Sequence, residues 1–167
     1  RILELSRQSE VCFCMEPSKP GYCTVARKGL ITFTINESFG KSMLGFLRSG
    51  LPSVKVMLDT FHMNIEETDM AAAIRHAGKL LGHFHTGECN RLVPGQGRMP
   101  WREIGQALRD IGYDKTVVME PFVNIGGQVG SDIKVWRTMV HDNSIEALDK
   151  SAADAVIFQR YMLDGKI

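Results

Sequence analysis

Residues 54–85 read VKVMLDTFHMNIEETDMAAAIRHAGKLLGHFH, and this stretch decides the fold of the chain. It begins with a short apolar run that ends at Asp59, and it closes with a second apolar run that leads to His85. Between these runs, residues 68–78 carry a capping residue, three consecutive alanines and a closing glycine, which predicts a helix. A strand, a helix and a second strand in this order are typical of a βαβ unit with parallel strands.

The same pattern continues on both sides of this stretch. Residues 11–15 form an apolar run that ends at Glu16, and residues 116–119 form another that ends at Glu120. Strands of a parallel sheet are buried on both faces, so continuous apolar runs of this kind fit them. Apolar spacing and capping residues predict further helices at 100–111, 131–140 and 144–162. We therefore expect an α/β fold with parallel strands and a terminal helix.

One segment, residues 17–50, does not follow the pattern. It is rich in proline and glycine, and residues 30–35 look like a strand where a helix is expected between two parallel strands. We treat the chain as a single domain over residues 1–167 that contains this irregular segment. Because the first residue is arginine and lies inside an apparent helix, we also expect the chain to be a piece of a longer protein.

Composition excludes several classes of protein. The chain has 20 Lys and Arg against 19 Asp and Glu, so its formal net charge of +1 gives no reason to expect nucleic acid or an anionic membrane as partner. Apolar residues make up 44% of the sequence, which is ordinary for a globular protein, and no apolar run is long enough for a membrane span. The four cysteines form no CxxC pair, which argues against a zinc ribbon; reduced thiols fit a cytoplasmic location.

The residues that end the four apolar runs suggest a shared metal site. They are Glu16, Asp59, His85 and Glu120, and in an α/β barrel the carboxyl ends of the strands surround one active site. Three carboxylates and one imidazole suit Mn²⁺, Mg²⁺, Co²⁺ or Fe²⁺ better than a structural zinc ion. Taken singly, each residue is more typical of a helix cap, a loop or the core, so the hypothesis rests on all four sharing one structural position.

Other polar residues lie next to these positions. His62 follows Asp59 by three residues and is expected either to contact a polar substrate or to lie in a surface loop. Arg91 lies in a loop rich in glycine and proline, where its forked donors could hold hydroxyl or phosphate oxygens; the alternative is an exposed loop cation. We assign His83 a structural role on the side of the strand opposite to His85. Trp101 and Trp136 are expected to pack within helices.

With these residues in place, the sequence resembles the ketose 3-epimerases, the D-tagatose and D-psicose 3-epimerase group of the xylose-isomerase-like TIM barrels. The resemblance implies the C-terminal half of a (β/α)₈ barrel, about strands five to eight, because a whole barrel takes about 250 residues. The segments that carry the resemblance are VKVMLDTFHMNIEE (54–67), GHFHTGECNRLVPGQG (82–97), EPF (120–122) and GQVGSDIKVWR (127–137).

The resemblance also implies a divalent metal, usually Mn²⁺ or Co²⁺ with Mg²⁺ as an alternative. Asp59, His85 and Glu120 match three of the four ligands of the family, and Glu16 is the candidate for the fourth. A departure affects Glu16: the family has a second glutamate six residues after its first ligand, where this chain has Tyr22.

His62 and Arg91 match family residues that contact the substrate. The implied reaction is epimerisation of a free ketose at C3 through an enediolate, with Glu16 and Glu120 as acid and base on opposite faces of the sugar. The implied protein is an isomerase that acts on a small ketose and forms a homo-oligomer in its full-length form. The alternatives are another sugar isomerase of the superfamily, a metal endonuclease, or an inactive fragment or half-barrel interaction module.

Overall fold

The computed structural model describes residues 12–16, 23–26, 30–34 and 54–165, and it describes side chains from Lys55 onward. Its strands are β1 (Cys12–Glu16), β2 (Cys23–Ala26), β3 (Leu30–Thr34), β4 (Val54–Asp59), β5 (Leu81–Thr86) and β6 (Val117–Met119). Its helices are α3 (Thr60–Glu66), α4 (Met70–Ala77), α5 (Trp101–Asp110), α6 (Gly127–Asp132) and α7 (Ile145–Gln159). Two short helical turns, Gly78–Leu80 and Arg160–Asp164, follow α4 and α7.

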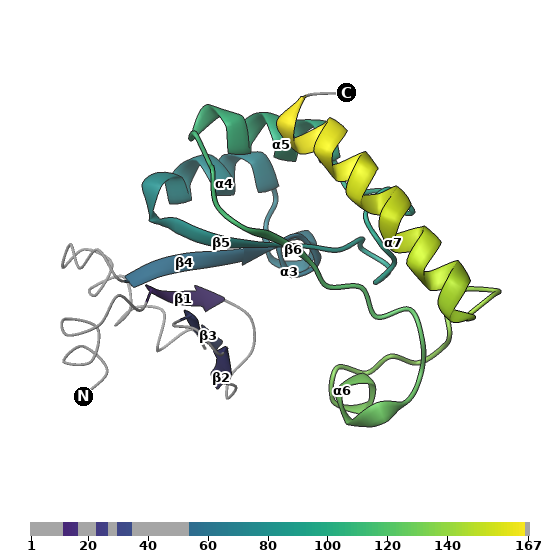
Figure 1. The fold of residues 1–167 in the computed structure, drawn as a ribbon. Coiled ribbons are helices and arrows are strands. Elements are labelled where there is room, and N and C mark those ends of the chain that lie inside the picture. Colours follow the sequence, from purple (N-terminus) through teal and green to yellow (C-terminus); the bar gives the residue numbers. More distant parts are fainter. Residues whose placement is uncertain (1–11, 17–22, 27–29, 35–53, 166–167) are drawn as a thin grey trace.

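The described strands form one sheet in the order β2-β3-β1-β4-β5-β6. The pairs β3–β1, β1–β4, β4–β5 and β5–β6 are parallel, and the pair β2–β3 is antiparallel. The four parallel strands predicted from the apolar runs are therefore confirmed, as is the strand expected near residue 30. Figure 1 shows α4 and α5 stacked on one side of β4 and β5, with α7 running obliquely beside them. None of the helices in the described ranges is long and apolar enough to span a membrane.

The hydrophobic core lies between β4 and β5 on one side and α4 and α5 on the other. Of the two residues that could cap this helix, Thr68 and Asp69, it is Asp69 that starts α4, because its carboxylate accepts a hydrogen bond from the N–H of Ala72 at 2.9 Å. The apolar face of this helix then reaches the sheet, where Ile74 is completely buried. The central members of this core are Leu58, Ile74, Leu81, Phe84, Ile104 and Leu108. Packing of β4 and β5 against α4 and α5 thus fixes the strand ends that carry Asp59 and His85.

The terminal helical turn approaches α5 closely. A Cβ atom added at Gly105 would collide with the carbonyl oxygen of Met162, so no larger residue fits between the two elements. Arg109, one turn further along α5, donates hydrogen bonds to the carbonyl oxygens of Met162 and Leu163 at 3.0 and 2.9 Å. These contacts fix the end of the chain against the layer of helices, as the predicted terminal helix requires.

Gly105→Ala is expected to destabilise the protein by about 1–3 kcal/mol, the usual cost of forcing an extra methyl group into a packed site. The added Cβ would meet backbone rather than a flexible side chain, so α5 and the terminal turn would have to separate. A urea melt followed by circular dichroism measures the loss. Arg102→Ala, at an exposed position of the same helix, is the control; equal stability of both variants would contradict the close approach.

The helix predicted at residues 131–140 is wrong. The structure has the short helix α6 earlier, starting after Gly126 and ending at Asp132. Gly126 and Gly127 have positive φ angles of 111° and 68°, which let the chain turn into α6, and Lys134 at φ 62° prevents the helix from continuing. Trp136 is consequently 84% exposed instead of packed, whereas Trp101 is buried as expected.

Candidate metal centre

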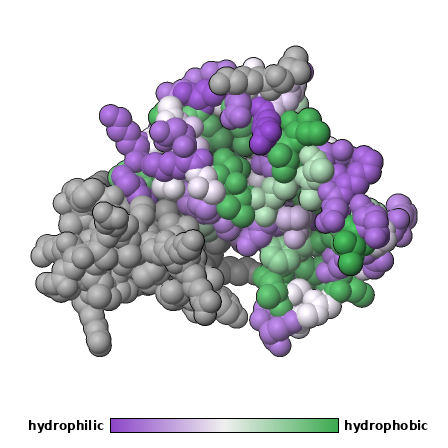
Figure 2. All heavy atoms as spheres, in the orientation of Figure 1, coloured by the Kyte–Doolittle hydropathy of each residue, from purple (hydrophilic) through white to green (hydrophobic). Residues whose placement is uncertain are grey.

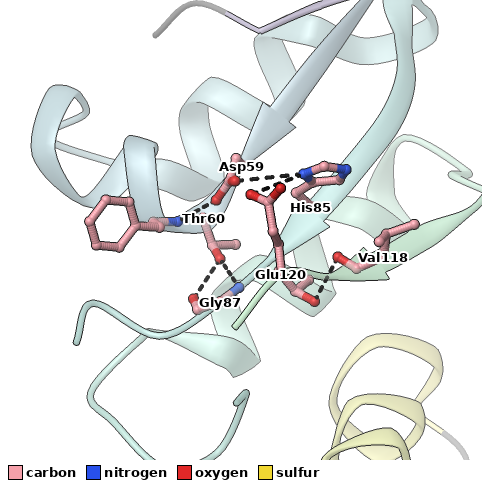
Figure 3. Close-up of polar contacts among 8 residues, drawn as sticks. Asp59, Thr60, His85, Gly87, Val118 and Glu120 are labelled. Atoms are coloured by element: carbon pink, nitrogen blue, oxygen red, sulfur yellow. Dashed lines mark hydrogen bonds and ion pairs between the residues drawn. The ribbon is translucent and has the colours of Figure 1, made fainter. Parts of the chain in front are cut away.

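The sheet register brings three of the predicted site residues to one edge. Asp59 and His85 end neighbouring parallel strands and are paired directly in the register of β4 and β5. Glu120 directly follows β6, and its backbone N–H donates a hydrogen bond to the carbonyl oxygen of Thr86 at 2.9 Å. Figure 3 shows the three side chains converging from these strand ends. The convergence predicted from the apolar runs is therefore present for Asp59, His85 and Glu120.

The ligand atoms of this triad lie within 4.8 Å of one another. His85 Nδ1 is 3.7 Å from Asp59 Oδ2 and 3.6 Å from Glu120 Oε2. The exposed fraction of the side chain rises from 2% at Asp59 to 17% at His85 and 39% at Glu120. The triad therefore has one buried carboxylate and one carboxylate that solvent or a ligand can reach.

A divalent cation fits this arrangement. His85 Nδ1 is buried without a hydrogen-bond partner, since both carboxylate oxygens are too distant for an ordinary hydrogen bond. A buried, unpartnered nitrogen that faces two carboxylates is the environment that a cation between the three groups would satisfy. Carboxylate oxygens with a single imidazole are the donors that Mn²⁺, Co²⁺, Fe²⁺ and Mg²⁺ accept. The assignment of these residues as ligands stays a prediction.

The electrostatics of the triad are coupled. Burial lowers the pKa of His85, but the two carboxylates favour its charged form more strongly and raise the pKa to about 9. Burial also acts to raise the pKa of Asp59, but His85, His62 and the N–H of Phe61 outweigh it and hold that pKa below its ordinary value. The N–H of Phe61 contacts Asp59 Oδ1 at 2.8 Å. Without a metal, the triad thus holds a proton on His85 at neutral pH.

Metal binding is expected to release this proton. A histidine that binds a metal ion must be neutral, whereas His85 with a pKa of about 9 is protonated at neutral pH. Apparent Mn²⁺ affinity should therefore rise about tenfold per pH unit from pH 7 towards pH 9 and level off above it. Calorimetric titration in buffers of different ionisation enthalpy counts the protons: about one per Mn²⁺ at neutral pH and none near pH 10. No proton release at neutral pH would contradict the assignment.

The same pKa fixes the sign of a stability effect in the metal-free protein. The folded-state pKa of His85 lies above the ordinary value of 6.5, so its interaction with the carboxylates contributes fully below about pH 6.5 and is lost as the pH rises through about 9. The proton on His85 therefore stabilises the two carboxylates at low pH, whereas a metal ion is expected to bind them best at high pH, where His85 is neutral.

Glu16 is the predicted fourth ligand, and the structure places its backbone but not its side chain. It is the last residue of β1, which is parallel to β4 and pairs Met15 with Val56. The carboxyl end of β1 thus lies at the same edge of the sheet as the carboxyl end of β4. Whether Glu16 completes the set stays a prediction, and Tyr22 falls outside the described residues.

The two predicted substrate-binding residues, His62 and Arg91, both contact Phe61, which lies two residues after Asp59. His62 lies in the first turn of α3, where its ring meets the edge of Phe61 with centroids 5.3 Å apart. The guanidinium carbon of Arg91 lies 3.3 Å from the centroid of the Phe61 ring and 5.3 Å from that of Phe122. Stacking on two rings holds the Arg91 cation in a fixed orientation.

A cavity of about 600 Å³ is lined by residues of the segments that follow Asp59, His85 and Glu120, although the three triad residues are not part of its lining. Phe61 and Phe122, each two residues beyond a triad carboxylate, form part of its wall together with Arg91. Sequence reasoning missed a second segment of the wall, which includes Lys134 and Trp136, since it expected a packed helix there. The full lining is Phe61, Cys89, Asn90, Arg91, Phe122, Ile133, Lys134, Val135, Trp136, Arg137 and Met139.

The surface near this wall is partly apolar. Ile125, which lies just before α6, and Val129, which lies within it, are more than half exposed. Figure 2 shows hydrophobic residues gathered around this part of the molecule, with hydrophilic residues beside them. The two non-glycine residues with positive φ in the described ranges, Arg91 and Lys134, both line the cavity. Strained backbone of this kind is concentrated at functional sites.

The expectation that His83 points away from His85 is wrong. Their ring centroids are 4.9 Å apart in an edge-to-face arrangement. Residues two apart in a strand share a face, so His83 lies one layer below His85 rather than behind it. Burial lowers the pKa of His83, and the neighbouring charge of His85 lowers it further, so the ring is neutral beside the triad.

Two hydroxyl groups that sequence reasoning missed hold the strand ends in place. Thr60, completely buried, donates to the carbonyl oxygen of Gly87 at 2.7 Å and accepts from its N–H at 2.9 Å, as Figure 3 shows. Thr86 donates to Gln159 Oε1 at 2.7 Å and so joins β5 to α7. Each threonine directly follows a predicted ligand, and this adjacency in the sequence was the available signal.

Parallel strands that alternate with helices, with two carboxylates and an imidazole gathered at the carboxyl ends of the strands, are the features of an α/β barrel with a site that could hold a metal. The chain belongs to the xylose isomerase-like TIM barrel family, whose model matches residues 1–139. This confirms the predicted fold class, with the chain forming a partial barrel.

Among its relatives are the D-psicose 3-epimerases of Agrobacterium fabrum and Enterocloster bolteae, which are 62% and 66% identical over 116 and 113 residues. These matches cover 70% and 68% of this chain, but only 40% and 38% of the relatives. The crystal structure of the D-psicose 3-epimerase of Clostridium cellulolyticum H10 with D-tagatose matches with a TM-score of 0.80 and 46% identity. It covers 97% of this chain and 53% of that structure, so the chain spans about half of a complete enzyme of this kind.

Proposed function

We propose that the protein takes part in the metal-dependent epimerisation of a free ketose at C3, which makes it an isomerase. The observation that carries the proposal is the convergence of Asp59, His85 and Glu120 at successive strand ends. The relatives named D-psicose 3-epimerase support the choice of reaction and a small sugar of the D-psicose or D-tagatose type as substrate, and the cavity lined by Phe61, Arg91 and Phe122 offers space for a small ligand.

Asp59, His85 and Glu120 would hold a divalent ion, with Glu16 as the fourth ligand. When bound, such an ion polarises a substrate carbonyl and offsets negative charge on adjacent oxygens. Asp59 is buried, and its carboxylate already accepts a hydrogen bond from the N–H of Phe61, which suits a group that only ligates. Glu120 is the more exposed carboxylate, so we assign it the transfer of the C3 proton.

Inversion at C3 requires a second acid or base on the opposite face of the sugar, because one group would return the proton to the face it left. We assign this role to Glu16, whose strand adjoins β4. His62 and Arg91 would hold oxygens of the substrate, and the stacking of Arg91 on Phe61 fixes the direction of its donors.

Three further points belong to the same proposal. Mn²⁺ is the expected ion, with Co²⁺ and Mg²⁺ as alternatives, because the triad offers oxygen ligands and a single nitrogen. The full-length protein is expected to form a homo-oligomer and to lie in the cytoplasm. The partner is a small ketose rather than nucleic acid, in keeping with the near-zero net charge.

Exchange of substrate hydrogen with solvent tests the proposal. The protein is incubated with Mn²⁺ and D-psicose in D₂O, and the sugars are followed by NMR, with a metal-free sample as control. Deuterium at C3 together with formation of the C3 epimer is the expected result. Formation of an aldose in place of the C3 epimer would instead identify a sugar isomerase. Tight Mn²⁺ binding without any exchange would identify an inactive fragment or a half-barrel interaction module.

A further inference from the structure

A buried carboxylate outside the triad organises the loop that follows β5. Glu88 is completely buried, and its carboxylate accepts three hydrogen bonds within the described part of the chain. Oε1 accepts from the N–H of Gly95 at 2.8 Å and from the indole N–H of Trp101 at 2.7 Å. Oε2 accepts from the N–H of Met99 at 3.2 Å. Several donors on one buried carboxylate satisfy a charge that would otherwise be costly to bury.

The backbone of the same residue closes the turn that presents Arg91. The N–H of Arg91 donates to the carbonyl oxygen of Glu88 at 3.0 Å, and the N–H of Glu88 donates to the carbonyl oxygen of Leu92 at 3.1 Å. Arg91 lies within this turn at a positive φ of 69°, a conformation that a non-glycine residue adopts only where its surroundings impose it. Its carbonyl oxygen accepts from the N–H of Phe122 at 2.9 Å, which joins the turn to the segment after Glu120.

We propose that Glu88 is a positioning residue for Arg91, and therefore for the substrate that Arg91 holds in the proposed function. Its carboxylate fixes both ends of the loop, from the start of the turn to the start of α5, so that the guanidinium group stays stacked on Phe61. Glu88 does not touch the reacting atoms in this account. It acts through the direction in which Arg91 donates its hydrogen bonds.

The site requires a carboxylate and tolerates no extra bulk. All three partners are N–H donors, so a glutamine would turn its own NH₂ group towards one of them and lose that hydrogen bond. Gly97 lies against Oε2, and a Cβ atom at residue 97 would collide with the carboxylate. Glu88→Gln and Gly97→Ala therefore disturb the same group by two independent routes.

The first measurement needs no activity. Stacking on Phe61 should move the Arg91 side-chain proton signals upfield, and comparison with Arg91→Lys assigns them by NMR. We expect Glu88→Gln and Gly97→Ala to lose most of this upfield shift. Glu103→Gln, the same substitution at an exposed residue of α5, should keep it. Unchanged Arg91 signals in both test variants would overturn the proposal, as would the failure of both to fold, because Glu88 would then support the fold as a whole.

The second measurement is a double-mutant cycle on the reaction. Glu88→Gln is expected to raise KM for the ketose about tenfold or more with little change in kcat, and the same effect is expected of Arg91→Ala. The combined variant should be no worse than Arg91→Ala alone, because both changes remove one contact. Additive losses, or a fall in kcat alone, would overturn the positioning role. If the unmodified protein shows no turnover, the proposed function fails while the NMR comparison still decides the role of Glu88.

Discussion

Replacing His85 with alanine is expected to weaken Mn²⁺ binding by roughly a hundredfold or more. Loss of a group that only supports a metal ligand already costs about 10- to 100-fold in affinity, and His85 is the central member of the triad. Its Nδ1 is the buried nitrogen that faces both carboxylates, at 3.7 and 3.6 Å. His85 is a cleaner choice than Asp59, which also accepts a hydrogen bond at the start of α3, so its loss would disturb the helix as well.

Calorimetric titration with Mn²⁺ measures the effect of His85→Ala. His76→Ala, at an exposed position in the last turn of α4, is the matched control and should bind Mn²⁺ like the unmodified protein. Circular dichroism establishes that both variants fold. Unchanged Mn²⁺ affinity in a folded His85→Ala variant would show that the metal binds elsewhere.

Glu120→Gln is expected to slow exchange of the C3 hydrogen by about 10²- to 10⁴-fold, the usual contribution of a general acid or base. The amide keeps an oxygen that can ligate but cannot take a proton, so most of the Mn²⁺ affinity should remain. The separation of these effects is informative because Glu120 is the exposed carboxylate of the triad, with 39% of its side chain accessible.

Deuterium incorporation at C3 measured by NMR, together with Mn²⁺ titration of the same sample, separates chemistry from metal binding. Glu67→Gln, at the exposed C-cap of α3, is the control for loss of a single negative charge near the site. Exchange at the unchanged rate in Glu120→Gln would rule out this residue as the base. Loss of both Mn²⁺ binding and exchange would contradict the expected retention of the metal and would show that the Glu120 carboxylate is required as a ligand.

The strand ends could be predicted because local chemistry determines them. An apolar run of five or six residues followed by Asp59 or His85 specifies a buried strand and a polar end, and parallel pairing then brings those ends together. The start of α4 was equally local, since Asp69 caps it through its own side chain. The antiparallel strand β2 left no comparable pattern among the prolines and glycines around it.

The remaining differences come from properties that spacing does not report. The apolar residues Ile133, Trp136 and Val140 repeat at helical intervals, but Lys134 adopts a left-handed conformation that breaks the helix between them. The role of Glu88 depends on Trp101 and Met99, which reach it only after the loop has folded back. The spacing of apolar residues shows which face a helix would bury if the helix forms. It carries no information on φ angles or on contacts across a loop.

The hydrogen bond between Thr86 and Gln159 couples two positions that are distant in the sequence. Most residues of α7 are exposed, where substitutions usually change stability little. Gln159 differs, because it supplies the acceptor for the hydroxyl of Thr86, buried next to His85 in the sequence. An apolar replacement of Gln159 would leave the Thr86 hydroxyl only the more distant carbonyl oxygen of Val118, at 3.4 Å, and an apolar replacement of Thr86 would remove this donor from the buried Gln159. We therefore expect the effect of a substitution at residue 159 to depend on residue 86, which couples α7 to the strand that carries His85.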